Sequence, residues 1–363
     1  MDMNQLLKSM DKKFGDGSLR EFGEYSTDVE AIPTGIPSLD LITGIGGFPR
    51  GRIIEIYGGE GAGKTTIALK IMAEAQKLKG QMPRGKQVNE NTKPIAGRVG
   101  FLDVEHALNP SLMELHGVRT EKGSGFYFDQ PMGGDEALDK LYMMVSSNLF
   151  DVIVVDSVSG LTTLDEREQD AGESVMAGTA RLMSTNLKKL TSVINASRTI
   201  VIFINQIREK PAVKFGSPET TSGGRALKFY SSMRLRISKK EQIKEGSTLQ
   251  IGHTMGISVK KNKLAPPFES TEVNLYYRDS ESKGKRGGFD IETDLIQTAK
   301  ATGVIELRGS QYNYVDMETG ELFKANGLVA FMKLIDENEG LLEKITNDIM
   351  EDKTYEPEQN EQE

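Results

Sequence analysis

The sequence contains no cysteine and no tryptophan, and its only histidines are His106, His116 and His253. Without cysteine the chain can form neither a disulfide framework nor a thiolate zinc site, and it cannot use a cysteine nucleophile. With three histidines, a histidine-rich metal centre is not expected. These absences exclude the classes of protein that depend on thiols or on several metal-bound histidines.

Long apolar runs are also missing. No stretch of about 18 apolar residues is present that could span a membrane. The first residues, MDMNQLLKSMDKKF, lack the apolar segment and the small-residue cleavage site of a signal peptide. We therefore expect a cytoplasmic protein. The chain has 363 residues, of which 37% are hydrophobic, and this suits two domains or one large domain with appendages.

The net charge of −8 is distributed unevenly. Residues 351–363 hold six acids and one lysine and so carry −5 of it. Such a segment cannot bury enough apolar surface to fold, and we expect a disordered tail that either keeps the protein soluble or competes with a polyanion for a basic surface of the same chain. Residues 77–98 hold six basic residues and one acid. Their prolines and glycines predict a loop, either merely solvated or in contact with a phosphate backbone.

Apolar strands alternate with amphipathic helices from Arg52 onward. Strands are predicted at residues 52–58, 99–105, 126–130, 151–157 and 199–206. Helices are predicted at residues 64–79, 135–150 and 176–194. The strands are apolar throughout, which indicates burial on both faces and a parallel sheet between helices. Three later segments are predicted to be antiparallel strands that extend this sheet, at residues 233–238, 254–262 and 271–278. The fold class is therefore α/β, with a mostly parallel twisted sheet flanked by helices.

The two ends of the chain are predicted to form separate parts. Residues 3–14 place Met3, Leu7, Met10 and Phe14 at helical spacing. This predicts a short amphipathic helix that needs a docking surface, on its own core or on a neighbouring subunit. A basic, glycine-rich break at 282–288 precedes a final helical and turn-rich region. We expect an N-terminal helix and linker, a core, a small α+β domain and a tail, at residues 1–32, 33–286, 287–350 and 351–363.

Residues 58–65, GGEGAGKT, match the phosphate-binding pattern G-x-x-x-x-G-K-[ST] and lie between a predicted strand and a predicted helix. The glycines allow backbone N–H groups to turn toward phosphate oxygens, and the helix N-terminus adds partial positive charge. Lys64 is expected to contact the β- and γ-phosphates, and the Thr65 hydroxyl to bind Mg²⁺. The nucleotide-binding residues expected here are Gly58, Gly59, Glu60, Gly61, Ala62, Gly63, Lys64, Thr65 and Thr66.

Three further polar residues follow predicted strands, where α/β folds carry their chemistry. Asp156 ends VIVVD and is predicted to hold the Mg²⁺ shell; the alternative is an acid that only caps a turn. Glu105 ends VGFLDVE and is placed to orient and polarise the attacking water; the alternative is a surface acid. Gln206 ends IVIFINQ, and its amide is placed to sense a γ-phosphate and to report its loss to the loop that follows.

These motifs, in this order, resemble those of the bacterial RecA recombinases over most of the chain. The most specific segment is PETTSGGRALKFY at 218–230. The other similar segments are DKKFGDGSLREFGE (11–24), PTGIPSLDLITGIGGFPRGRIIEIYG (33–58), FLDVEHALNP (101–110), VIVVDSVSGL (152–161) and VKKNKLAPPF (259–268). The resemblance implies a RecA-like P-loop ATPase core that forms helical filaments on single-stranded DNA, binds ATP with Mg²⁺ between subunits, and exchanges strands with a homologous double-stranded DNA.

The resemblance also implies roles for individual residues. It makes Glu105 the catalytic carboxylate and leaves Lys64, Thr65, Asp156 and Gln206 in the roles described above. Lys261 and Lys263 would reach the phosphates of the neighbouring subunit, so that hydrolysis depends on assembly. Residues 1–32 would then serve oligomerisation, and residues 287–350 would gather duplex DNA.

Two loops, at about 168–176 and 207–222, are implied to line the filament axis and to hold DNA. The contacts would be made to the DNA backbone and would not depend on base sequence. The residues expected to contact DNA are Met176, Arg181, Ser184, Lys188, Arg208, Gly223, Gly224 and Arg225. Met176 is either a wedge between base triplets or plain core.

The chain departs from the family pattern at several positions. Leu112 stands where an aromatic residue stacks on adenine, and Asn109, which we retain among the nucleotide-binding residues, stands where the family has an acid. Both predict a looser or rearranged recognition of the base. Pro211 replaces a β-branched wedge in the second loop, and the loop at 77–98 is longer than in typical members. Together these departures suit a phage-encoded relative.

Two other functions are compatible with the same core. A ring-shaped helicase or translocase also uses paired DNA loops, but the N-terminal helix, the segment at 218–230 and the lack of a second helicase domain argue against it. A nucleotide-gated filament would mainly recruit partners and would use hydrolysis only to time its disassembly.

Overall fold

The computed structural model describes residues 2–15, 18–19, 29–78, 97–162, 176–209, 219–281 and 284–351. The chain divides into two compact units, Met1–Glu30 and Ala31–Glu363.

The described part of the first unit contains helix α1 (Met3–Phe14), as predicted. Asp2 begins it with a capping box, in which Oδ1 of Asp2 accepts from the Gln5 backbone N–H at 2.8 Å and Oε1 of Gln5 accepts from the Asp2 backbone N–H at 3.2 Å. None of its side chains is buried, and Met3 and Phe14 are 66% and 63% exposed. The apolar face of α1 therefore has no cover among the residues of its unit that the structure describes.

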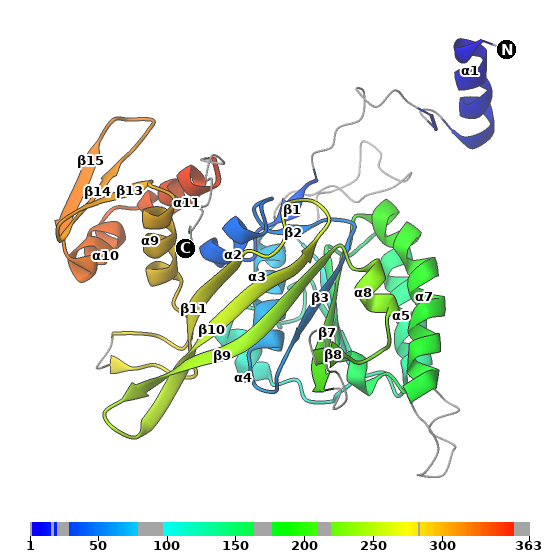
Figure 1. Ribbon diagram of the computed structural model, residues 1–363, viewed down its shortest axis with the longest axis horizontal. Coiled ribbons are helices and arrows are strands. Elements are labelled where there is room, and N and C mark those ends of the chain that lie inside the picture. The colour runs from blue at the N-terminus through cyan, green and yellow to red at the C-terminus, as the bar shows by residue number, and fades with distance from the viewer. Residues whose placement is uncertain are drawn as a thin grey trace, which may run out of the picture. The chain divides into compact units, whose positions relative to one another are not determined.

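The second unit is built on a ten-stranded sheet in the order β12-β11-β10-β9-β3-β7-β6-β4-β5, with β8 paired to β7 (Figure 1). The strands from β9 to β5 run parallel, and β9 to β12 are antiparallel. This confirms the mostly parallel sheet with an antiparallel extension. The bounds are β3 (Ile53–Gly58), β4 (Val99–Asp103), β5 (Phe126–Asp129), β6 (Val152–Asp156), β7 (Ile200–Glu209), β8 (Glu219–Thr221), β9 (Met233–Glu245), β10 (Leu249–Asn262), β11 (Ser270–Tyr276) and β12 (Gly288–Phe289).

Helices cover both faces of this sheet. One face packs on α3, with Ile67 and Leu69 in its core, and the other packs on α5 and α7, with Leu141 and Leu187 (Figure 1). Every residue of β3, β4 and β6 is buried, which explains why these strands are apolar at consecutive positions. The helices here are α2 (Pro37–Ile42), α3 (Lys64–Lys77), α4 (Pro110–Leu115), α5 (Gly134–Ser146), the 3₁₀ helix η2 (Val158–Gly160), α7 (Met176–Ser197) and α8 (Ala226–Tyr230). A short pair, β1 (Ala31–Ile32) and β2 (Phe48–Pro49), precedes them.

Four strands differ from the prediction: β9 and β10 are longer than the predicted segments 233–238 and 254–262, and β5 and β7 differ in their neighbours. The apolar segment at 126–130 was expected to be buried on both faces, but β5 is an edge strand, and Tyr127 and Phe128 are 50% and 46% exposed. An apolar run does not reveal whether a strand has a neighbour on each side. Strand β7 was expected to end at Gln206, but it continues to Glu209 because its last residues pair with β8. The two ends of the expected loop at 207–222 are therefore strands.

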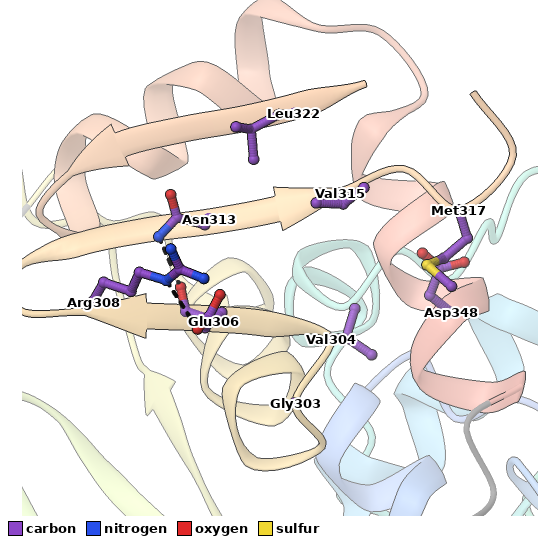
Figure 2. A pocket seen from close by; sticks show the side chains of 9 residues that line it. All are labelled: Gly303, Val304, Glu306, Arg308, Asn313, Val315, Met317, Leu322 and Asp348. Atoms are coloured by element: carbon purple, nitrogen blue, oxygen red, sulfur yellow. Dashed lines mark hydrogen bonds and ion pairs between the residues drawn. The ribbon is translucent and has the colours of Figure 1, made fainter. Parts of the chain in front are cut away.

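The C-terminal region has a core of its own, which includes Leu295, Tyr314, Phe331 and Ile345. Its elements are α9 (Ile291–Ala301), β13 (Ile305–Arg308), β14 (Gln311–Val315), β15 (Leu322–Asn326), α10 (Leu328–Glu337) and α11 (Leu341–Glu351). The three strands form a separate antiparallel sheet. Its outer face, with the end of α11, lines a pocket of about 760 Å³ that contains none of the predicted site residues (Figure 2).

Among the helices that the structure describes, none combines the length and the apolar composition that a membrane span requires.

Candidate nucleotide and DNA site

The carboxyl ends of β3, β7, β6 and β4 meet at one edge of the sheet. Gly58 of β3 is level with Gln206 of β7, and Asp156 of β6 is level with Asp103 of β4. Because these four strands are neighbours in this order, the structure places the phosphate-binding loop, Gln206, Asp156 and Glu105 along the same edge.

The phosphate-binding loop leads from β3 directly into α3. Gly63 is the N-cap of α3 with φ +96°, and a Cβ there would lie 2.1 Å from Cε of Met255. Only glycine meets both demands at this position. The Lys64 ammonium donates to the Gly59 carbonyl at 2.8 Å, so it bridges the loop. Burial lowers the pKa of Lys64, and the nearby carboxylates of Asp156 and others oppose that shift.

Thr65 and Asp156 form a pair of oxygen ligands beside this loop. Oγ1 of Thr65 donates to Oδ2 of Asp156 at 2.7 Å. Burial raises the pKa of Asp156 to about 6; the Thr65 bond opposes the shift, whereas the carboxylates of Glu105 and Asp103 add to it. A cation would relieve this accumulation of negative charge, and Mg²⁺ prefers such oxygen ligands. In the described ranges, no group of three or more histidine or acidic side chains is placed to hold a metal ion.

Glu105 lies two residues beyond the end of β4, not at the strand end as predicted. The backbone N–H groups of Val104 and Glu105 donate to the Asp156 carbonyl at 2.7 and 3.2 Å, and they hold this segment against β6. Oε1 of Glu105 accepts from Nε2 of Gln206 at 3.2 Å and from the Ser157 hydroxyl. The structure therefore brings the predicted carboxylate and the predicted sensor amide into direct contact.

Sequence reasoning missed Asp103 and Ser157. Asp103 is buried, and its carboxylate accepts from the backbone of Ala107 and Leu108 at 3.2 and 3.1 Å, so it holds the turn that carries Glu105. The two acids of the motif DVE were the available signal for it. Nothing in the sequence indicated that the Ser157 hydroxyl would contact Glu105.

Asn109 and Leu112 lie at the start of α4. Asn109 caps this helix, and its Oδ1 accepts from the Ser111 backbone N–H at 2.9 Å. Leu112 is half-buried and packs against the core on the α3 side of the sheet. The Leu112 side chain is therefore committed to packing.

Several of the predicted DNA-binding residues share one surface. Arg181, Ser184 and Lys188 are exposed on one side of α7. Gly223 and Gly224 approach the same helix, since Cβ atoms there would lie 3.4 Å from Cγ of Met183 and 2.8 Å from Cβ of Ala180. Both glycines have positive φ, of +80° and +74°, which side chains rarely allow.

Two predicted arginines lie next to this surface. Arg225 is exposed and begins α8, and Nε of the exposed Arg208 donates to Oγ of Ser222 at 2.9 Å.

Several predictions lie outside the described residues. These are the loop residues 163–175, the side chain of Met176, residues 210–218 with Pro211, residues 79–96 of the basic loop, and the tail from 352 to 363.

Lys261 lies on β10, two strands from β3, and is level with Glu55 in the strand pairing; Lys263 follows the end of β10. Lys261 donates to the carbonyls of Lys228 and Phe229 at 2.8 and 3.0 Å, and Lys263 donates to the Phe229 carbonyl at 3.3 Å. Burial lowers the pKa of Lys261 to about 8, and the nearby cations of Lys263 and Arg234 add to this effect. The structure does not bring these lysines to the nucleotide residues of their own chain.

Comparison with known proteins places this arrangement among recombinases. The sequence model described as RecA N-terminal domain matches residues 1–282. The chain is 42% identical to Protein RecA of Bacillus subtilis (strain 168) over 320 residues, which cover 88% of this chain and 84% of that protein. It is 42% identical to Protein RecA of Thermus thermophilus over 351 residues, which cover 96% of this chain and 93% of that protein. It is 40% identical to Protein RecA of Bacillus pumilus over 350 residues, which cover 96% of this chain and 91% of that protein.

Proposed function

The chain belongs to the RecA family of ATP-dependent recombinases, and we propose that it hydrolyses ATP at the carboxyl edge of its parallel sheet while assembled as a filament on single-stranded DNA. The filament then pairs this strand with a homologous duplex and exchanges strands. The proposed setting is the cytoplasm. The observation that supports this most directly is the contact between Glu105 and Gln206 beside the phosphate-binding loop.

Each residue of the edge has a distinct task in the proposed reaction. Backbone N–H groups of residues 58–66 and the Lys64 ammonium bind the phosphates. Glu105 accepts a hydrogen bond from the attacking water and orients it toward the γ-phosphorus. Gln206 changes its partner from Glu105 to the γ-phosphate when ATP is bound and returns to Glu105 after phosphate release. The base of the nucleotide is proposed to be held by Asn109 and the start of α4, the helix that Asn109 caps.

Thr65 and Asp156 are the residues that would hold Mg²⁺. When bound, the metal would supply positive charge that offsets the negative charge of the phosphate groups. Within this pair, the Thr65 hydroxyl keeps the Asp156 carboxylate directed at the phosphate side of the loop.

We assign Lys261 and Lys263 to the site of a neighbouring subunit. Lys261 is paired with Arg234, and Arg234 with Glu55, which precedes Gly58 by three residues along β3. At about 3.3 Å per residue and 4.8 Å per strand, Lys261 and Gly58 are about 14 Å apart along the sheet. A lysine there contacts phosphate only in another copy of the chain, where it stabilises the charge of the transferring phosphoryl group.

Single-stranded DNA is proposed to bind along α7 and the segment 222–225. The cations of Arg181, Lys188, Arg208 and Arg225 contact phosphates, with Ser184 as a further donor. Gly223 and Gly224 present bare backbone N–H groups, which suits binding independent of base sequence. Met176 is proposed as the wedge between bases.

The domain division of the sequence analysis is retained as part of this proposal. Residues 1–32 serve assembly, 33–286 hydrolysis and DNA binding, and 287–350 duplex DNA. Residues 287–350 contain twelve acids and five lysines or arginines, so any duplex contact there must be made by a few cations within an acidic surround. Comparing duplex binding by residues 1–350 and by residues 1–286, which both lack the acidic tail, decides whether this domain attracts or repels DNA.

The experiment that tests the proposed function measures ATPase activity with and without single-stranded DNA. Wild type should be stimulated, Lys64→Ala should lose nucleotide binding, and Glu105→Gln should bind nucleotide and assemble but not hydrolyse. Electron microscopy with a non-hydrolysed ATP analogue should show helical filaments. Closed rings would favour a translocase. A Glu105→Gln variant that hydrolyses ATP at the wild-type rate would contradict the catalytic role proposed for Glu105.

A further inference from the structure

We infer that two buried side chains outside the nucleotide site, Glu55 and Asn205, couple the DNA-facing segment to the catalytic amide of Gln206. Both side chains are fully buried, and neither contacts phosphate in the proposed reaction. The inference rests on the proposed function, because it concerns how DNA binding controls hydrolysis at that site.

The side-chain amide of Asn205 forms hydrogen bonds with both main-chain groups of Ser222. Oδ1 of Asn205 accepts from the Ser222 N–H at 3.2 Å, and Nδ2 donates to the Ser222 carbonyl at 3.0 Å. Ser222 directly precedes the glycine pair of the proposed DNA surface, and its hydroxyl accepts from Nε of Arg208 at 2.9 Å. A shift of this segment on binding DNA is therefore transmitted to the Asn205 side chain.

The same amide is tied to the catalytic edge. Oδ1 of Asn205 also accepts from the backbone N–H of Gln206 at 2.9 Å, and the Gln206 side chain donates to Glu105 at 3.2 Å. Asn205 and Gln206 point to opposite faces of β7 in the strand pattern, so a movement of one changes the position of the other through the shared backbone. Two adjacent side chains thus connect the DNA-facing segment with the catalytic carboxylate.

Glu55 adds a buried hydrogen bond to the Asn205 amide in the orientation that the backbone groups of Ser222 and Gln206 also require. An amide has one donor end and one acceptor end of nearly equal shape. The Glu55 carboxylate only accepts, and its Oε1 takes the bond from Nδ2 of Asn205 at 3.0 Å. Oδ1 of Asn205 then faces its two donors, the backbone N–H groups of Gln206 and Ser222. Arg234 donates from Nε to the other carboxylate oxygen of Glu55, and its guanidinium lies 4.5 Å from the Tyr57 ring centre.

The network ends near the interface lysines. Arg234 is paired with Lys261 across β9 and β10. The buried chain of contacts therefore runs from the proposed DNA segment, through Asn205 and Glu55, to the strand position of the lysine assigned to the neighbouring site. Hydrogen bonds thus join the proposed DNA segment to the γ-phosphate sensor and to Arg234, and strand pairing continues the path to Lys261.

The test replaces the Glu55 carboxylate without changing its shape. In Glu55→Gln, the side chain at 55 has one acceptor oxygen for two donors, Nδ2 of Asn205 and Nε of Arg234, so one of the two buried hydrogen bonds is lost and the Asn205 amide is held less firmly. We expect nucleotide binding and DNA-independent ATPase activity to stay within about twofold of wild type, while the stimulation by single-stranded DNA falls about tenfold, as is usual for coupling between two sites. Asn205→Ser, which removes the bridge to Ser222, should act in the same way and replaces Glu55→Gln if that variant does not fold.

The matched control is Asp151→Asn. It alters another buried ion pair, Arg50 with Asp151 at 2.7 Å, at the amino ends of the strands. A purely structural effect lowers the unfolding temperature and reduces both ATPase rates by the same factor, as expected for this control. Equal reduction of both rates in Glu55→Gln and Asn205→Ser, or unchanged stimulation in both, would overturn the inference. If single-stranded DNA does not stimulate the ATPase activity of the wild-type protein, the proposed function itself is contradicted.

Discussion

The proposal that the active site is shared between neighbouring subunits predicts that two inactive variants restore each other. Glu105→Gln removes the carboxylate that orients water, and Lys261→Ala removes the cation supplied to the neighbour. Each alone should lower DNA-stimulated ATPase activity about 100-fold or more, as is usual for the loss of a general base or of a preorganised charge. Lys261 lies about 14 Å from Gly58 of its own chain by strand geometry, and in the proposed assembly the two losses belong to opposite sides of one interface.

The size of the recovery follows from how the filament is built. Each interface joins two different surfaces, so an equal mixture places an intact carboxylate against an intact lysine at about one interface in four. We therefore expect about a quarter of the wild-type rate, with the maximum at equal amounts. The assay is ATP hydrolysis on single-stranded DNA at constant total protein and varied mixing ratio.

The matched control combines Glu105→Gln with Lys64→Ala. Both residues lie on the same side of the interface, so no mixed interface is complete and no activity should return. Fluorescence energy transfer between labelled variants confirms that mixed filaments form. The assignment of Lys261 to the neighbouring site would be refuted by mixed filaments that show no recovery, or by equal recovery in the control mixture.

Three further predictions concern single features. Lys261, with a pKa lowered to about 8, is a cation below that pH and loses its charge as the pH rises through it, so DNA-stimulated ATPase activity should decline above about pH 8. Lys261→Arg should shift this decline to higher pH because arginine stays charged; an unchanged pH profile would contradict the role of this charge. Gly63→Ala places a Cβ 2.1 Å from Met255 at φ +96°, and it should weaken ATP binding about tenfold or more, measured with a fluorescent analogue. A wild-type affinity of Gly63→Ala for the ATP analogue would show that the loop accommodates the added Cβ without loss of binding. Deleting residues 351–363 removes five negative charges and should tighten duplex DNA binding, most at low salt, because screening acts over about 10 Å at 0.1 M. Equal duplex affinities of the 1–350 and full-length proteins at low salt would leave the tail as a solubilising terminus.

The chemistry of the nucleotide site could be predicted from contiguous residues. The contiguous segment RIIEIYGGEGAGKT at 52–65 specifies a strand, a tight turn and the start of a helix, because the strand, the glycines and the first turn of α3 follow one another in the chain. Asp156 and Glu105 could be assigned because the carboxyl ends of parallel strands meet at one edge whatever their order. The contact between Glu105 and Gln206 confirms that the two residues lie together; their catalytic roles stay predictions.

Only the tertiary structure decided the partners of residues far apart in the chain. Glu55 in the buried strand RIIEIYG indicates that a partner exists, because a buried carboxylate is costly unless it is paired. That the partners are Asn205 and Arg234 depends on strand order and register, which local periodicity does not encode. The exposure of β5 and the hydrogen bond of Lys261 to α8 also depend on how distant segments are placed in the tertiary structure. A sequence pattern states which face of an element is apolar, whereas the neighbour of that face is set by how the whole chain packs.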